Sequence, residues 1–296
     1  MIKGPFSYSG NKTRIYNAYL KPVLRKFNRV HEPFVGSGVC LYNSLNGGIA
    51  TDLDPAVVAL HNALADETLP DKMLSCYNEY FATGHTSENY LALRSVFNKD
   101  WKVNGFTSEN IHQLYVLSQI AFNSLIRFSS SGFNVPFGEK PLDVERIRLH
   151  CKLFKEKDIQ VTLSHYNTID LSSVDKLNDI IYLDPPYIAS KFQYGGWTKD
   201  DELELLDFIR RLDVQGYKFI LSNTFSHKGQ VNNDLIEWSK NYNAYVIDMS
   251  YNAWSARVSS VEREDETIEV LITNLNDGFD DLVDAHAKKL KTEKLF

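Results

Sequence analysis

Asp179-Ile180-Ile181-Tyr182-Leu183-Asp184-Pro185-Pro186-Tyr187 is the stretch on which the prediction of the fold rests. Residues 179–183 form a nearly continuous apolar run, which is typical of a strand buried on both faces of a parallel sheet. In open α/β sheets, ligands bind beyond the carboxyl ends of the strands. The tetrapeptide 184–187 therefore stands where such a fold places its chemistry.

Strand-like and helix-like segments alternate on both sides of this stretch, which indicates an α/β fold. Between about residues 66 and 150 the pattern changes to helical stretches with polar loops. We therefore predict an α/β core of residues 1–56 and 158–274, a mainly helical insertion at 57–157, and a polar tail at 275–296. The predicted helices are 12–27, 39–43, one that Pro55 opens, 199–213 and 231–241; the predicted strands are 30–35, 48–52, 159–163, 179–183, 218–222, 244–247 and 268–272.

Composition limits the class of protein. The chain has 296 residues, and its hydrophobic content of 43% is ample for a packed core. We expect no membrane segment, because neither a 20-residue apolar span nor the apolar stretch of a signal peptide is present. Cys40, Cys76 and Cys151 form no CxxC pair, so we expect no metal site and a reducing, cytoplasmic location.

The net charge of -6 argues at first against a nucleic-acid partner. The distribution of charge weakens that objection, because residues 1–31 contain seven basic residues and no acid. Residues 110–138 also contain no acid and carry Arg127. A protein that is acidic overall can still present a local surface to a polyanion.

The Asp184-Pro185-Pro186-Tyr187 motif suits an amine substrate. Two consecutive prolines fix an extended turn and remove two N–H donors. The Asp184 carboxylate and the Pro185 carbonyl are then acceptors that can converge on one exocyclic amine, which offers two N–H groups. Held in this way, the nitrogen lone pair is directed toward an electrophile. The Tyr187 ring offers a face on which a base can stack.

A glycine turn in the first fifth of the chain suits a ribose-containing cofactor. Gly36-Ser37-Gly38 follows a predicted strand and opens a helix, so the backbone can approach a ligand closely. Leu41 stands where a dinucleotide-binding fingerprint has its third glycine. Asp52 comes sixteen residues after Gly36, at the end of the next predicted strand, where an acid can bind ribose hydroxyls.

Four motifs occur in an order that resembles Dam-type N6-adenine DNA methyltransferases, nearest to phage and enterobacterial members. They are Tyr8-Ser9-Gly10-Asn11-Lys12, Glu32-Pro33-Phe34-Val35-Gly36-Ser37-Gly38, Asp52 and Asp184-Pro185-Pro186-Tyr187. The similarity runs over roughly residues 5 to 274. It implies S-adenosylmethionine bound on a Rossmann-like core, a helical target-recognition insertion, and double-stranded DNA as the partner.

The resemblance also implies roles for individual residues. The catalytic residues would be Asp184, Pro185, Pro186 and Tyr187. The cofactor-binding residues would be Tyr8, Lys12, Phe34, Gly36, Gly38, Asp52, Tyr166 and Asp184. The DNA-binding residues would be Phe122, Asn123, Leu125, Arg127, Pro136 and Lys140, with Arg127 suited to a bidentate contact with guanine. Residues 133–138 resemble the hairpin that follows the segment inserted into the duplex.

The chain departs from the family pattern at two places. Glu139 and Lys140 stand where GATC methylases have an arginine that reads the outer guanine, although Lys140 is a possible point donor. Tyr166 is followed by Asn167 where an acid is usual, while Ser222-Asn223 matches a polar pair of the family. These differences leave the target sequence open.

The resemblance therefore predicts methyl transfer to N6 of a flipped adenine in duplex DNA, at GATC or a related short site. The setting would be the cytoplasm of a bacterial cell or of a phage-infected host. Two alternatives stay open at this point. One is methylation of an amine on RNA or protein, and the other is a DNA-binding regulator whose catalytic site has decayed.

Overall fold

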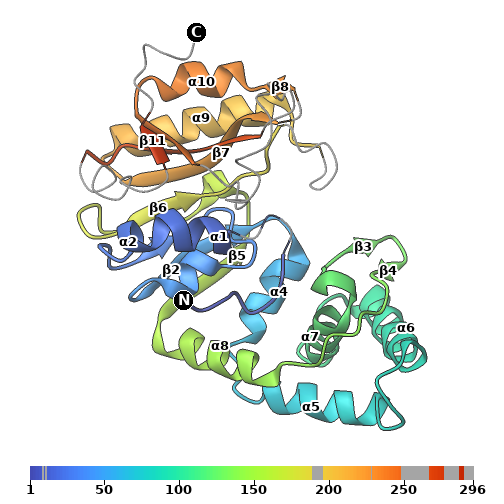
Figure 1. Cartoon of the computed structure of the whole chain (residues 1–296). Coiled ribbons are helices and arrows are strands. Elements are labelled where there is room, and N and C mark those ends of the chain that lie inside the picture. The colour runs from blue at the N-terminus through green and yellow to red at the C-terminus, as the bar shows by residue number, and fades with distance from the viewer. Residues whose placement is uncertain are drawn as a thin grey trace, which may run out of the picture. The chain divides into compact units, whose positions relative to one another are not determined.

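The computed structural model describes residues 1–8, 10, 12–188, 196–227, 229–247, 267–276 and 287–289, and these divide into two units (Figure 1). Unit 1 comprises Met1–Arg14 and Val35–Ile169, and unit 2 comprises Ile15–Phe34 and Asp170–Phe296. Ser9 and Asn11 of the predicted N-terminal motif lie outside the described residues, as does most of the predicted tail.

A mixed sheet is the centre of unit 2. Within the described residues it has seven strands in the order β1-β6-β7-β10-β9-β11, with β8 paired to β7. β1, β6 and β7 run parallel, whereas β10 is antiparallel to both of its neighbours, β7 and β9. The strands are β1 (Val30–His31), β6 (Ile180–Leu183), β7 (Phe219–His227), β8 (Gln230–Val231), β9 (Asn243–Ile247), β10 (Ile268–Thr273) and β11 (Ala287–Lys289).

The position of β6 confirms the prediction made from its apolar run. All four of its residues are buried, and it has a parallel neighbour on each side. The predicted strand 30–35 was too long, because the ladder of β1 ends at His31, two residues before Pro33, which has no N–H to donate. β7 extends beyond the predicted residue 222, because β10 and β8 pair with it as far as His227.

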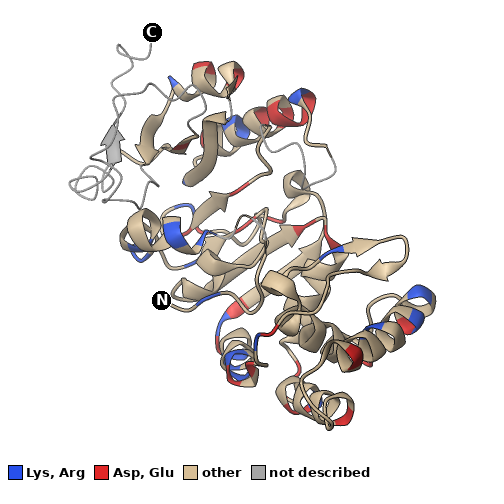
Figure 2. Cartoon of the chain, turned by 45° about the vertical axis from the view of Figure 1, so that its right-hand side comes forward, with Lys and Arg blue, Asp and Glu red and all other residues tan. Residues whose placement is uncertain are grey.

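Helices α9 (Lys199–Val214) and α10 (Asn233–Ser239) lie side by side, and both contact β7 (Figure 1). Thr198 and Asp201 form a capping box at the start of α9, and Asn232 caps α10. The predicted helix 12–27 is present as α1 (Thr13–Ile15), the π-helical turn η1 (Tyr16–Leu20) and α2 (Lys21–Leu24). Lys and Arg residues appear along this helical run in Figure 2, and Arg25 and Lys26 at its end are exposed.

Unit 1 combines a parallel strand pair with a group of helices. β2 (Gly47–Asp52) pairs with β5 (Asp158–Leu163), and Asp52 stands opposite Leu163. The helical stretch predicted near 66–150 is present: α5 contacts α7 and α8, and α6 contacts α7. The helices are α3 (Val39–Asn43), α4 (Pro55–Ala63), α5 (Leu69–Tyr80), α6 (Ser87–Asn104), α7 (Ile111–Ile120) and α8 (Val144–Glu156).

The core of unit 1 lies around α7. Its residues from Leu114 to Ile120 are all buried, as expected for a helix surrounded by others. After α7 come the 3-10 turn η2 (Phe122–Ser124) and a short hairpin of β3 (Phe128–Ser129) and β4 (Gly132–Phe133). The 3-10 turn η3 (Tyr166–Thr168) follows β5. No helix among the described residues is long and apolar enough to cross a bilayer.

Candidate active site

The Asp184-Pro185-Pro186-Tyr187 motif leaves the carboxyl end of β6, as the sequence predicts. Asp184 and Tyr187 are half-buried and Pro185 is buried. The Tyr187 hydroxyl lies 3.4 Å from Asp184 Oδ1 and 3.4 Å from Ser222 Oγ. Ser222 reaches this place because Leu183 and Leu221 are paired in the β6–β7 register. The structure thus brings together the motif and one member of the predicted polar pair.

Phe34 follows the end of β1, the other parallel neighbour of β6. Its ring lies edge-on to Trp197, with ring centroids 6.0 Å apart and an interplanar angle of 74°. The carboxyl ends of parallel strands meet at one edge of a sheet. Phe34, Asp184 and Ser222 therefore belong to the same edge of the sheet of unit 2.

A buried carboxylate lies behind this edge. Glu202, in the first turns of α9, is 0% exposed and accepts three hydrogen bonds. The donors are Trp197 Nε1 at 2.9 Å, Asn223 Nδ2 at 3.2 Å and Asn232 Nδ2 at 2.9 Å. Burial raises the pKa of Glu202, and the three hydrogen bonds partly offset that effect.

In unit 1 the predicted cofactor loop, residues 36–38, is fixed by hydrogen bonds at both the N–H and the carbonyl of Gly36. The Gly36 N–H donates to Asp52 Oδ2 at 3.0 Å, and the Gly36 carbonyl lies 2.9 Å from His61 Nε2. A carbonyl only accepts, so Nε2 carries the hydrogen and Nδ1 accepts from the Tyr42 hydroxyl at 2.9 Å. Burial lowers the pKa of His61 to about 4, which keeps the imidazole neutral in this role.

The loop has a backbone that only glycine adopts at low cost. Gly36 has φ +46° and Gly38 has φ +65°. A Cβ on Gly36 would lie 3.1 Å from the Tyr8 ring, so Tyr8 lies against the bare backbone of the loop. Lys12 is on the same N-terminal segment, and its Nζ donates to the Gly10 carbonyl at 3.0 Å.

Asp52 combines two tasks. Its Oδ1 accepts the Asp54 N–H and its Oδ2 accepts the Gly36 N–H, both at 3.0 Å. Burial raises the pKa of Asp52, and the backbone hydrogen bonds from Asp54 and Gly36 oppose that rise. Each carboxylate oxygen keeps a further lone pair, so the side chain can accept ribose hydroxyls while it fixes the loop.

The predicted DNA-binding residues gather after α7. Phe122 is 54% exposed, and the side chains of Asn123, Arg127, Pro136 and Lys140 are exposed as well. Leu125 differs from the others, because it is half-buried against the core of unit 1.

The backbone of this segment is strained and clamped. Asn123 and Ser124 have φ values of 55° and 52°, which non-glycine residues rarely adopt. The Phe122 N–H donates to the Pro136 carbonyl at 2.9 Å, and the Gly138 N–H donates to the Ile120 carbonyl at 2.8 Å. Strain of this kind persists where the surroundings hold it, and it is frequent at binding sites.

Side-chain hydrogen bonds fix two of the predicted contact residues. Lys140 Nζ donates to Ser124 Oγ at 3.2 Å. Arg127 Nε donates to Asn134 Oδ1 at 2.6 Å, and one Arg127 terminal nitrogen donates to the Asn134 carbonyl at 3.1 Å. Asn134 therefore holds the Arg127 guanidinium in one orientation.

Tyr166, predicted to stack on the cofactor, is buried in η3 beside His165, with ring centroids 4.2 Å apart. The His165 Nδ1 lies 2.8 Å from Asn167 Oδ1, at the position where the family has an acid. Tyr8, Gly36, Gly38, Asp52 and Tyr166 belong to unit 1, whereas Phe34 and residues 184–187 belong to unit 2.

Sequence reasoning missed His61 and Glu202. His61 stands with Val57, Val58 and Leu64 on one buried face of α4 and its end. Glu202 precedes Leu205, Leu206 and Ile209 at helical spacing, so it also stands on the apolar face of its helix. A polar residue on such a face has to find buried partners, and this is the signal that reveals both residues.

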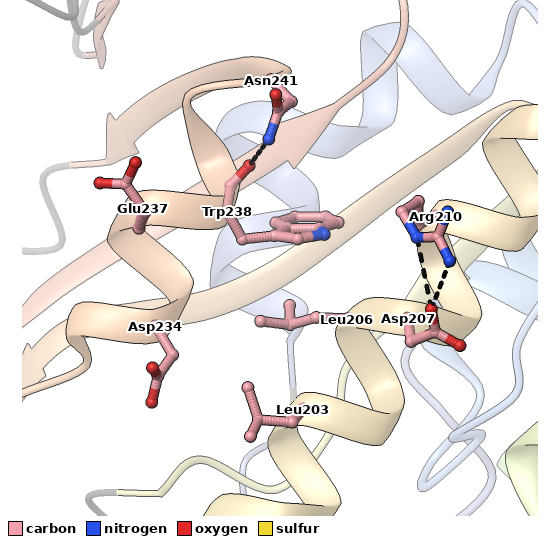
Figure 3. A pocket seen from close by; sticks show the side chains of 8 residues that line it. All are labelled: Leu203, Leu206, Asp207, Arg210, Asp234, Glu237, Trp238 and Asn241. Carbon is pink, nitrogen blue, oxygen red and sulfur yellow. Dashed lines mark hydrogen bonds and ion pairs between the residues drawn. The ribbon is translucent and has the colours of Figure 1, made fainter.

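A surface pocket of 420 Å³ lies between α9 and α10 (Figure 3). None of the predicted site residues lines it, and Asp207 on its wall is bonded to Arg210. Its lining residues are Leu203, Leu206, Asp207, Arg210, Asp234, Glu237, Trp238 and Asn241. The pocket is therefore separate from the candidate site described above.

Comparison with known proteins agrees with these features. The chain is 30% identical over 290 residues to the type II methyltransferase M.FokI of Planomicrobium okeanokoites, covering 92% of the chain and 43% of that protein. It is 30% identical over 192 residues to a DNA adenine methylase of Haemophilus influenzae, covering 62% of the chain and 63% of that protein. It is 24% identical over 239 residues to the DNA N-6-adenine-methyltransferase of Escherichia phage P1, covering 74% of the chain and 29% of that protein.

The chain thus spans less than half the length of M.FokI. The model of the D12 class N6 adenine-specific DNA methyltransferases matches residues 8–253, which include all four motifs and the exposed segment after α7. Because that match covers well over half of the sequence, the chain belongs to the D12 class N6 adenine-specific DNA methyltransferase family.

Proposed function

We propose that this chain transfers a methyl group from S-adenosylmethionine to N6 of an adenine in double-stranded DNA. The observation that carries the proposal is the position of Asp184-Pro185-Pro186-Tyr187 at the carboxyl end of the buried strand β6. Membership of the D12 family supports adenine as the substrate. The motif supports an exocyclic amine as the acceptor group.

The motif residues position the amine. The Asp184 carboxylate and the Pro185 carbonyl each accept a hydrogen bond from one of the two N6–H groups. These bonds turn the nitrogen lone pair toward the methyl group. The same acceptors favour a tetrahedral nitrogen. They therefore bind the transition state more strongly than the ground state. S-adenosylmethionine supplies an electrophilic methyl group on a sulfonium. Tyr187 supplies the face on which the adenine ring stacks.

The glycine loop and Asp52 of unit 1 support the proposal of a cofactor site. Gly36 and Gly38 let the loop pack closely against Tyr8, Tyr42 and His61, and the remaining lone pairs of Asp52 suit ribose hydroxyls. These features fit a nucleoside. The residues proposed for the cofactor are Tyr8, Lys12, Phe34, Gly36, Gly38, Asp52, Tyr166 and Asp184.

The segment after α7 would bind DNA, within a target-recognition insertion of residues 57–157. Exposed Phe122 and Asn123 suit entry into a base stack, and an oriented Arg127 suits a guanine edge. A paired adenine cannot present N6 to the methyl group, so the base has to be flipped out of the duplex. The target would be GATC or a related short site, with Leu125, Pro136 and Lys140 also near the DNA.

An Asp184→Ala variant tests the proposal, with Asp200→Ala on exposed surface as the control. Asp184 is one of eight residues proposed for the cofactor, so we expect Asp184→Ala still to bind S-adenosylmethionine by isothermal titration, although it forms no N6-methyladenine in duplex DNA. Normal methylation by this variant would refute the proposal. The same assay with RNA and protein substrates tests the amine alternatives, and failure of the wild type to bind the cofactor would favour a decayed regulator.

A further inference from the structure

Glu202 is buried within a run of acids that otherwise faces solvent. Asp200 and Glu204 are exposed, whereas Glu202 is 0% exposed. Burying a carboxylate costs several kcal/mol unless hydrogen bonds satisfy its oxygens. We infer that Glu202 is a positioning residue that seats Trp197 against Phe34, and so shapes the cofactor side of the proposed site.

The three donors divide between the two oxygens. Oε2 accepts from Trp197 Nε1, while Oε1 accepts from Asn223 Nδ2 and Asn232 Nδ2. Trp197 is a donor only, because the indole has no acceptor. A group with two acceptor oxygens and no hydrogen is therefore the partner that this arrangement requires.

Both amides are prevented from turning round. Asn232 Oδ1 accepts the Leu235 N–H at 3.1 Å, which is the cap of α10. Asn223 Oδ1 accepts the Thr224 N–H at 2.7 Å. Rotating either amide by half a turn would lose these bonds, so each presents its NH₂ group to Glu202.

The carboxylate links α9 to the edge of the sheet that carries the motif. Through Trp197 it reaches Phe34 at the end of β1, with the edge-on contact at 6.0 Å. Through Asn223 it reaches β7 next to Ser222, whose hydroxyl lies 3.4 Å from that of Tyr187. The aromatic contact is the branch directed to the cofactor, and in this respect the inference rests on the proposed function.

Glu202→Gln separates the hydrogen bond to Trp197 from the hydrogen bonds to Asn223 and Asn232. The fixed amides of Asn223 and Asn232 require the Gln oxygen at the Oε1 position, so its NH₂ group has to face the Trp197 N–H. Two donors cannot bond, and Trp197 loses its place while the two asparagines keep theirs. We expect the dissociation constant for S-adenosylmethionine to rise by about twofold to tenfold, the equivalent of one aromatic contact.

The test is a double-mutant cycle measured by isothermal titration with S-adenosylmethionine on the full chain. Trp197→Phe removes the N–H and keeps an aromatic ring. If Glu202 acts through Trp197, Glu202→Gln weakens cofactor binding in the wild type and has no further effect in the Trp197→Phe chain. At saturating cofactor, kcat should stay within about twofold, since the motif is intact. Exposed Glu204→Gln is the matched control and should leave binding unchanged.

Two results would overturn the inference. One is an unchanged cofactor affinity in Glu202→Gln, and the other is an equal effect of this substitution with and without the indole N–H. Melting temperatures identify a variant that fails to fold. If Glu202→Gln fails to fold, the cofactor affinity of Trp197→Phe is compared with that of the wild type, because this milder variant also removes the Glu202–Trp197 hydrogen bond. A wild-type chain that neither binds S-adenosylmethionine nor methylates DNA would instead refute the proposed function.

Discussion

Substituting Gly38 by alanine tests whether the loop before α3 is held as the structure shows. Gly38 has φ +65°, and a Cβ there would lie 3.0 Å from Tyr42 Cε2 and 3.1 Å from His61 Cε1. Gly216, after α9, offers a matched control. Its N–H donates to the Asp213 carbonyl and the Tyr217 N–H donates to the Leu212 carbonyl, the pattern of a left-handed glycine that ends a helix. Its φ is +84°, and a Cβ there would meet nothing within 4 Å. The two variants share a left-handed backbone and differ in crowding.

The strain and the crowding can be estimated separately. A left-handed conformation costs an L-residue about 1–2 kcal/mol, which both variants lose from the free energy of unfolding. Crowding a well-packed site adds about 1–3 kcal/mol. Gly38→Ala should incur that addition, because Tyr42 and His61 are fully buried and bonded to each other. We therefore expect a loss of about 2–5 kcal/mol for Gly38→Ala and about 1–2 kcal/mol for Gly216→Ala.

Urea unfolding measures these losses, and titration with S-adenosylmethionine measures their effect on the cofactor site. His61 donates to the Gly36 carbonyl, so a displaced His61 should disturb the loop and weaken cofactor binding. Exposed Gly216→Ala should leave cofactor affinity unchanged. Equal losses of stability in the two variants, or normal cofactor binding by Gly38→Ala, would refute this account of the loop.

Substitutions at three further positions probe other parts of the chain. Tyr187→Phe should lower kcat by less than about fivefold, because the contacts of the Tyr187 hydroxyl are long at 3.4 Å. Tyr187→Ala should lower kcat at least about tenfold, because it removes the face on which the base stacks. Methylation assays on the two variants check both values. Gly138→Ala places a Cβ 2.9 Å from backbone atoms of Ala121 and Phe122, so DNA affinity in gel-shift assays should fall while cofactor affinity stays. Burial lowers the pKa of His61 from its ordinary 6.5 to about 4, so between these pH values the unfolded chain binds a proton that the folded chain does not. Stability should therefore fall as pH drops from 6.5 to 4, and His61→Gln should reduce this fall by up to about 3 kcal/mol in urea unfolding followed across pH.

The parts of the fold that depend on apolar periodicity are predictable from the sequence. The strand 179–183 and the helix 199–213 are observed within one residue at each end, as β6 and α9. The strand order is a different matter, because β10 lies between β7 and β9 although it follows both in the chain. Apolar patterns identify a strand without specifying its neighbour, so non-local pairing stays beyond such reasoning.

Motifs predict the residues of the candidate site better than they predict the buried residues that fix those residues in place. Asp184 and the glycine loop are recognisable because their residue types are tied to one chemistry. Glu202 stands in the acidic run 200–204, which favours a solvated helix start, and only its spacing to Leu205 and Leu206 indicates burial. Its partners Trp197, Asn223 and Asn232 come from three separate segments, and the sequence alone does not join them.

The buried polar groups have one physical task in common. Asp52, His61 and Glu202 each accept or donate hydrogen bonds to a segment outside regular secondary structure or to its anchoring side chains. Apolar packing is non-directional and tolerates small shifts, so it cannot by itself fix a loop to the accuracy that the proposed methyl transfer requires. A buried hydrogen bond is directional, and leaving its partner unsatisfied costs about 1–3 kcal/mol. These groups therefore contribute less to the net stability of the fold than to the choice of one loop conformation.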